Sequence, residues 1–277
     1  MSAADLASGK GHRDENFPVA SHLIASRFRP PVMAYYFFAR GADDIADNPA
    51  ASPQAKLDGL EAMRLSLIGT EAGEPTAEAL RQVLQARDLD PVHGLELLKA
   101  FRQDVTKGRY ADWDELMDYC RYSAMPVGRF VLDVHGEARS TWPANDALCA
   151  ALQIINHLQD CGKDYRELDR VYLPESILRR HGARVEELGG AVATPALRAA
   201  IADCAGRCET LLAQSARFAR EIKDRRLSLE VAVIQRLAID LAARLRERDP
   251  LAARVVHRKG EALGLAARAV IGRMLGR

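Results

Sequence analysis

Oxygen-bearing side chains gather in two short segments of this 277-residue chain. The first segment, 43–47, has the pattern D-D-x-x-D, and the second, 156–164, has the pattern N-x3-D-x3-D. An α-helix turns about 100° per residue, so residues four positions apart lie on one face. If both segments are helical, Asp43 and Asp47 point together, and the second segment presents a ladder of oxygen donors along one face.

Both segments adjoin apolar residues, and burying a carboxylate is costly unless it is paired or binds a metal ion. Oxygen ligands suit Mg²⁺, which usually binds one or two carboxylates, keeps several waters and is completed by substrate phosphates. Two acidic helices that face each other can therefore hold a diphosphate through bridging Mg²⁺ ions. We favour this interpretation over two exposed acidic faces, because both segments also have cationic residues close by in the sequence.

The first segment taken alone has a simpler explanation. It is followed by Asn48-Pro49, so it can be the solvated end of a helix, although acidic residues there meet the unfavourable end of the helix dipole. Arg40 lies three residues before Asp43 and four before Asp44. It can compensate these charges, or it can equally reach a phosphate.

Composition excludes some classes of function. The formal net charge is +1 and 48% of the residues are hydrophobic, which argues against a nucleic-acid binder and predicts a sizeable core. The charge is uneven, because residues 220–277 contain 14 Lys/Arg and 7 Asp/Glu. This basic C-terminal segment can contact an anionic membrane surface, or it can be an ordinary solvated face.

Cysteine usage and the chain ends predict a cellular location. The five cysteines form no C-x-x-C pair, and their odd number suits a reducing compartment. The N-terminus is polar rather than a secretory signal, and no stretch approaches the roughly 18 uncharged apolar residues of a membrane span. We expect a cytoplasmic protein, peripheral at the inner face of the membrane if its basic C-terminal segment binds lipid.

Helix-forming residues dominate, and alternating β-branched runs are missing. Prolines stand where helices can begin, except for Pro126, which is expected to kink a helix beside a pocket wall. The sequence predicts a single all-α domain over residues 1–277. The predicted helices are 31–46, 54–69, 77–87, 91–106, 112–136, 144–166, 195–223, 227–248 and 250–275.

Other motifs that carry chemistry are missing from the sequence. It has no Gly-rich dinucleotide loop, P-loop, H-E-x-x-H or G-x-S-x-G. The seven histidines are scattered. His157 lies inside the second acidic segment, but a single helical histidine is usually satisfied locally, so we assign it no catalytic role.

These motifs together resemble the squalene/phytoene synthase family, over nearly the whole chain from residue 15 to at least residue 174. The two acidic segments match the family's two acidic motifs, and R-V-Y-L-P at 170–174 follows the second. Between them, Tyr-Cys at 119–120 and Val-Gly at 127–128 match a central segment. Residues 15–21 and 122–129 resemble the hydroxysqualene synthases of bacterial hopanoid biosynthesis, although Met125 replaces the asparagine expected there.

The resemblance implies an all-α isoprenoid synthase fold around a central apolar cavity, with the isoprenoid presqualene diphosphate as substrate. It implies that Mg²⁺ ions bridge the diphosphate. The expected metal ligands are Asp43, Asp47, Asn156, Asp160 and Asp164. Asp44 is expected to support Arg40 instead.

The resemblance also implies roles beside the leaving diphosphate. Besides the carboxylates of Asp43 and Asp160, Tyr119 is expected to act there, and Tyr172 to add a second hydroxyl. Arg40 is expected to donate to phosphate oxygens in the planar fork geometry that suits them. Arg129 and Arg170 are further candidates for phosphate binding.

Ionisation of such a substrate leaves a carbocation, which apolar and aromatic walls stabilise and shield from water. Phe17, Tyr36, Phe37 and Phe130 are candidates for these walls, and each can also be ordinary core. Addition of one water would give hydroxysqualene and diphosphate without a redox cofactor. The resemblance further predicts handover of the substrate from a presqualene diphosphate synthase.

Two alternatives stay open. An enzyme of the same fold can condense two farnesyl diphosphates head to head, giving presqualene diphosphate, squalene or dehydrosqualene. A helical chain of this composition can also be a catalytically silent adaptor that binds membranes, although the intact acidic ladders argue against it. A terpene cyclase is disfavoured because its second motif carries Ser/Thr and Glu, where this chain has only aspartates.

Overall fold

A computed structural model describes residues 23–275, and among these residues no β-strand occurs. The chain divides into two compact units, and it passes between them more than once. The first unit contains residues 23–107 and 126–138, and the second contains 108–125 and 139–275. No helix in the described part is long and apolar enough to cross a membrane.

The first unit is a bundle around α1. Its elements are η2 (Ser26–Phe28), α1 (Arg29–Asp47), α2 (Pro53–Ile68), α3 (Pro75–Ala86), α4 (Val92–Thr106) and all but the first residue of α6 (Met125–His135). The apolar face of α1 packs against α2, α3 and α4. Tyr35 of α1 anchors this packing, because its ring stacks on Phe130 at 4.2 Å and its hydroxyl donates to the His93 carbonyl at 3.0 Å. The far end of α1, which carries the acidic residues, is thereby held in place.

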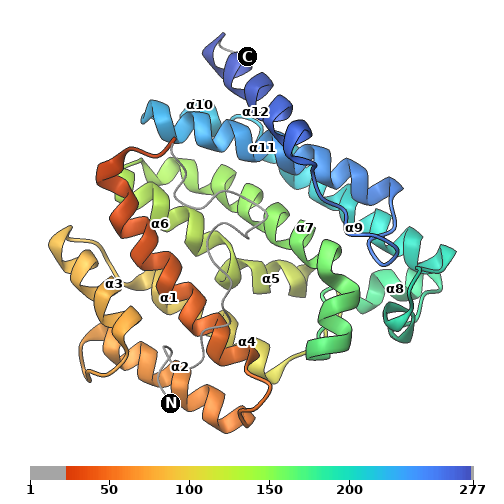
Figure 1. The fold of residues 1–277 in the computed structure, drawn as a ribbon, viewed down its shortest axis with the longest axis horizontal. Helices are drawn as coiled ribbons and strands as arrows, with labels where there is room; N and C mark the ends of the chain where they lie inside the picture. The colour runs from red at the N-terminus through yellow and green to blue at the C-terminus, as the bar shows by residue number, and fades with distance from the viewer. Residues whose placement is uncertain (1–22, 276–277) are drawn as a thin grey trace. The chain divides into compact units, whose positions relative to one another are not determined.

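The second unit is built on α7. Its elements are α5 (Trp113–Ser123), η3 (Arg139–Thr141), α7 (Trp142–Leu168), α8 (Glu175–His181), η4 (Val185–Gly189), α9 (Pro195–Gln214), α10 (Phe218–Glu221), α11 (Arg225–Glu247) and α12 (Lys259–Met274). Helix α7 packs against α5, α9 and α11, and α12 lies along α11 (Figure 1). Local signals start several helices: Asp112, Thr194 and Asp224 cap α5, α9 and α11 with their side-chain oxygens.

The structure corrects three of the predicted helices and adds one that was not predicted. The expected helix 112–136 is two helices, because Ala124 leaves helical geometry and Pro126 stands at the start of α6, where its missing N–H is harmless. The predicted helix 195–223 ends at Gln214 and is followed by the separate short α10. The predicted helix 250–275 begins only at Lys259, and α8 was not predicted.

All five cysteines are free thiols, as their spacing indicated. Burial raises the pKa of Cys120, Cys161 and Cys204 to about 12, and it raises the pKa of Cys208 as well. These side chains are therefore protonated, unreactive parts of the core of the second unit.

Candidate active site

The last turns of α1 bring Arg40 together with two carboxylates. Arg40 Nη1 lies 3.0 Å from Asp43 Oδ2, and Arg40 Nη2 donates to Asp44 Oδ1 at 2.8 Å. The Asp44 side chain is only 7% exposed, whereas that of Asp43 is 37% exposed. Of the two roles open for Arg40, the structure shows charge compensation. Asp44 supports Arg40 as expected, and Asp43 remains the more accessible carboxylate.

The electrostatics of this cluster disfavour an ionised Asp43. Burial, the repulsion of Asp47 and that of Asp44 raise the pKa of Asp43 to about 7, although Arg40 acts in the opposite direction. Nearby cations therefore do not fully compensate the negative charge of an ionised Asp43. The hard oxygen donors and this deficit of cations fit a bound Mg²⁺.

Asp104 belongs to the same cluster and was not predicted. It lies near the end of α4, is buried, and its repulsion contributes to the raised pKa of Asp43. The sequence does contain a signal for it: Leu97, Ala100 and Asp104 follow helical spacing and all are buried. A carboxylate on the apolar face of a predicted helix could have been identified from that pattern.

The second acidic segment, the ladder of oxygen donors at 156–164, lies on α7. Burial and the repulsion of Asp164 raise the pKa of Asp160, and Arg254, whose Nε is 4.0 Å from Asp160 Oδ1, partly offsets this. Asp164 Oδ2 lies 3.8 Å from His157 Nδ1. Asn156 stands one turn before Asp160 on the same helix. This cluster therefore resembles the first: in both, neighbouring carboxylates repel each other and nearby cations do not fully compensate their negative charge.

A group of aromatic rings lies beside the second ladder. The His157 ring stacks on that of Tyr172 with the centroids 3.5 Å apart, and the Tyr119 ring is 5.4 Å from the Tyr172 ring. The structure thus brings together the two tyrosines predicted for the diphosphate site. It also places His157 between Tyr172 and Asp164, and it adds Tyr110, whose ring is 5.4 Å from that of Tyr119.

Backbone contacts of the segment that follows α7 position Tyr172. The Val171 N–H donates to the Gly108 carbonyl at 2.9 Å, and the Glu175 N–H donates to the Tyr110 carbonyl at 2.9 Å. Gly108 permits this approach, since a Cβ there would lie only 2.8 Å from the Asp169 carbonyl oxygen. The two segments that carry Tyr110 and Tyr172 therefore run in direct contact.

The remaining predicted substrate residues are placed as follows. Arg170 is buried directly after the ladder, and its N–H donates to the Asp164 carbonyl at 3.2 Å. Arg129 and Tyr36 are half-buried and lie in the first unit, on α6 and α1. Phe17 lies outside the described residues.

The aromatic wall predicted for the first unit divides by exposure. Phe37 is 52% exposed and its ring meets that of Tyr36 edge-on at 5.6 Å. Phe130 is 2% exposed and stacked on Tyr35, so it belongs to the core.

Among residues 23–275, no three His, Cys, Asp or Glu side chains form a group that could hold a metal ion.

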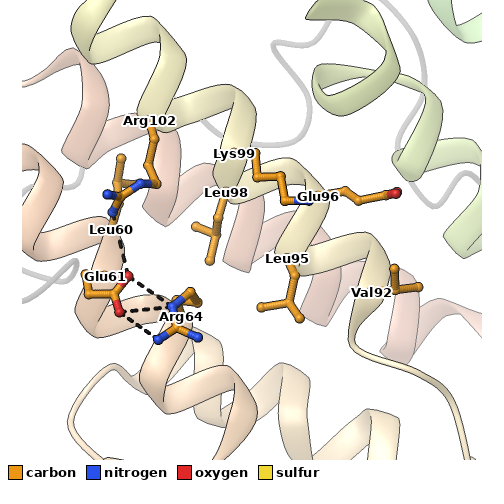
Figure 2. Close-up of a pocket in the computed structure, with 9 residues that line it drawn as sticks. All are labelled: Leu60, Glu61, Arg64, Val92, Leu95, Glu96, Leu98, Lys99 and Arg102. Carbon is orange, nitrogen blue, oxygen red and sulfur yellow. Dashed lines mark hydrogen bonds and ion pairs between the residues drawn. The ribbon is translucent and has the colours of Figure 1, made fainter. Parts of the chain in front are cut away.

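A separate groove of about 480 Å³ lies between α2 and α4. Leucine side chains form its apolar part, and Arg64 donates to both carboxylate oxygens of Glu61 at its edge (Figure 2). Arg102 Nη1 lies 3.6 Å from the same carboxylate. None of the predicted site residues lines this groove.

Comparison with solved structures places this fold in one class, the all-α isoprenoid synthases. The solved structure of a squalene synthase from Alicyclobacillus acidocaldarius matches with a TM-score of 0.74 at 32% identity, over 88% of this chain and 91% of that one. A dehydrosqualene synthase structure matches with a TM-score of 0.81 at 21% identity, over 99% and 97% of the two chains, and supports the fold.

The sequence comparisons give the family. The family model for squalene/phytoene synthase matches residues 11–261, and the chain belongs to this family. A hydroxysqualene synthase from Zymomonas mobilis is 57% identical over 99% of this chain and 93% of its own length. Another from Rhodopseudomonas palustris is 55% identical over 92% and 87% of the two chains. The chain is therefore an enzyme, and the adaptor alternative is set aside.

Proposed function

We propose that this enzyme converts presqualene diphosphate and water into hydroxysqualene and diphosphate, as a step of hopanoid biosynthesis. The observation that carries the proposal is the identity of 48–57% with three hydroxysqualene synthases over at least 92% of this chain. Phytoene synthases match at about half that identity, with 30% for the protein from Thermus thermophilus. The hydroxysqualene synthases are thus the better guide to the reaction.

We propose Mg²⁺ as the metal, held by the oxygen donors of the two ladders. The ligands would be Asp43, Asp47, Asn156, Asp160 and Asp164. When bound, Mg²⁺ supplies Lewis-acid stabilisation of the charge that develops on the leaving diphosphate. The raised pKa values of Asp43 and Asp160 support this assignment, because both carboxylates are short of positive charge.

Protein donors would complete the diphosphate site. Arg40 already presents its guanidinium to two carboxylates of α1, and its fork geometry also suits phosphate oxygens. The hydroxyls of Tyr119 and Tyr172 would donate to the departing group, and Tyr172 is held for this by its stack on His157. Arg170, next to the second ladder, and Arg129 are the further phosphate partners.

The reaction breaks the bond between carbon and the diphosphate oxygen and leaves a cyclopropylcarbinyl cation. Aromatic side chains stabilise such a cation with their π-faces, and we assign this role to Tyr36 and Phe17. The cation rearranges to the linear 1–1′ skeleton, a water oxygen bonds to carbon, and one proton is released. Because no electrons are transferred, the reaction requires no redox cofactor.

A second candidate function is the head-to-head condensation of two farnesyl diphosphates. It is favoured by one observation, the 32% identity with a protein described as a squalene synthase in its solved structure. Condensation requires sites for two diphosphates, whereas the hydroxylating reaction requires a site for one.

The setting of the enzyme is also a proposal. We infer that it works in the cytoplasm, peripherally at the inner face of the membrane, because its proposed substrate is a C30 lipid and its C-terminal segment 220–277 is basic. We further propose that it receives presqualene diphosphate from a separate presqualene diphosphate synthase.

The function is tested by supplying the purified enzyme and Mg²⁺ with either presqualene diphosphate or farnesyl diphosphate, with and without NADPH. The proposal predicts hydroxysqualene from presqualene diphosphate only, at a rate indifferent to NADPH. Conversion of farnesyl diphosphate to a C30 product would instead establish the condensing function. Failure to convert either substrate would contradict both.

A further inference from the structure

The last helix carries an apolar stripe that the protein leaves exposed. The three most exposed large apolar side chains among residues 23–275 are Met274 at 75%, Leu263 at 72% and Leu275 at 67%, and Ile271 is 58% exposed. Leu263, Ile271 and Met274 are spaced by eight and three residues, so they share one face of α12. The stripe from 263 to 275 is roughly 18 Å long at 1.5 Å per residue.

The opposite side of α12 is fixed to the protein. Leu265 is buried, and α12 packs along α11 (Figure 1). Near its end, Arg273 Nε donates to the Ser228 hydroxyl oxygen at 2.8 Å and to the Ala219 carbonyl at 3.2 Å. The helix therefore presents its apolar stripe from a defined position.

Positive charge surrounds the stripe. Residues 258–275 contain Arg258, Lys259, Arg268 and Arg273 against one acidic residue, Glu261. That acidic residue is already compensated, because Arg244 Nη1 donates to Glu261 Oε2 at 3.0 Å. An apolar stripe flanked by basic residues has the character of an interfacial helix that binds anionic lipid.

The segment next to the end of α12 extends this positive charge. The contact of Arg273 with Ala219 brings residues 217–226 beside α12, and this segment contains five Lys/Arg and two Asp/Glu. One of the two acidic residues, Asp224, caps α11 by accepting from the Leu227 N–H at 2.9 Å. The basic end of the second unit therefore lies against the same part of α12 as Ile271 and Met274.

We propose that α12 is a membrane-docking helix that lies flat on an anionic bilayer. The stripe residues enter the interface, and the exposed Arg258, Lys259 and Arg268 contact lipid phosphates. Pairing of the stripe with a second copy of the chain is the less favourable occupant, because a symmetric contact would place the same basic residues opposite one another. The proposal does not depend on the reaction catalysed, since docking is measured without substrate.

The test measures co-sedimentation of the purified full-length protein with phosphatidylcholine vesicles that do or do not contain about 30% phosphatidylglycerol, at low and high salt. The stripe variant is Leu263→Ser with Ile271→Ser, and the charge variant is Lys259→Gln with Arg268→Gln. The matched controls are Val192→Ser, which is 65% exposed before α9, and Arg121→Gln, whose side chain is 61% exposed on α5. Circular dichroism melts establish that every variant is folded.

The proposal predicts that the wild type binds anionic vesicles and that binding weakens as salt increases. The stripe variant should lose about tenfold or more in affinity and the charge variant several-fold, while both controls stay within about twofold of the wild type. Wild-type protein that ignores anionic vesicles, or a stripe variant that binds like the wild type, would overturn it. So would analytical ultracentrifugation that shows a dimer of the wild type and a monomer of the stripe variant.

Discussion

Replacing Asp43 by asparagine should make the protein more stable while it removes activity. The folded-state pKa of Asp43 is about 7, well above its ordinary value of 3.8. The folded protein therefore binds this proton more tightly than the unfolded chain does. Between about pH 4 and pH 7 the wild type gains stability as the pH falls, and above pH 7 it bears the full cost of an ionised Asp43. The asparagine amide never ionises, so the variant escapes this cost.

The size of the effect follows from the pKa of Asp43. A change from 3.8 to about 7 corresponds to about 4 kcal/mol at 1.36 kcal/mol per pKa unit. Because the Asp43 side chain is 37% exposed, screening by water reduces this to about 1–2 kcal/mol. For a chain of this length, that free energy corresponds to a rise of roughly 2–5 °C in the melting temperature.

The assay compares melting temperatures of the wild type and Asp43→Asn from about pH 5 to pH 8 without divalent metal. The variant should be more stable near pH 8, and the difference should shrink as the pH falls. Mg²⁺ with a diphosphate analogue should then stabilise the wild type more than the variant. Equal or lower stability of Asp43→Asn near pH 8, or a difference independent of pH, would refute the reasoning.

The neighbouring Asp44→Asn provides a matched control of opposite sign. Asp44 is 7% exposed and accepts from Arg40 at 2.8 Å, so its loss removes a nearly buried ion pair. This variant should be less stable than the wild type near pH 8. If both substitutions stabilised the protein, the effect would reflect general acidic crowding rather than the environment of Asp43.

Asp160→Asn should lower turnover by about 100-fold or more with little change in melting temperature, and a variant that keeps more than about a tenth of the rate would exclude a metal role. Arg40→Gln should destabilise the protein near pH 8, because Asp43 and Asp44 both lose their cation. Thermal melts measure this, and an unchanged melting temperature would contradict it. Treatment with EDTA should abolish turnover and added Mg²⁺ should restore it, so activity that survives chelation would count against the metal. Tyr172→Phe, which retains the stack on His157, should lower kcat more than it weakens binding of a diphosphate analogue; equal losses would indicate that the hydroxyl acts only in binding.

The two helices that matter most for the site could be predicted closely from the sequence. The prediction of 31–46 compares with α1 at Arg29–Asp47, and that of 144–166 compares with α7 at Trp142–Leu168. Both helices have proline in the first turn and an apolar face, so local signals suffice. The four-residue spacing then orders the acidic residues on each helix without any knowledge of the tertiary structure.

Sequence reasoning failed where distant segments decide the structure. Asp104 adds to the first cluster because α4 packs on α1, and Tyr110 joins Tyr172 because Gly108 lets two segments touch. His157 lacked a role as an isolated residue, and its place between Tyr172 and Asp164 depends on the segment after α7. The spacing of residues within one helix does not reveal contacts between distant segments. These contacts add polar groups to the site that the motifs do not indicate.

The central claim is that water captures the cation and supplies the hydroxyl oxygen of the product. The most direct measurement is conversion of presqualene diphosphate by the wild-type enzyme with Mg²⁺ in water labelled with oxygen-18, followed by gas chromatography and mass spectrometry. The account predicts hydroxysqualene that carries one labelled oxygen and release of unlabelled diphosphate. Unlabelled hydroxysqualene, or a hydrocarbon product from the same substrate, would contradict it.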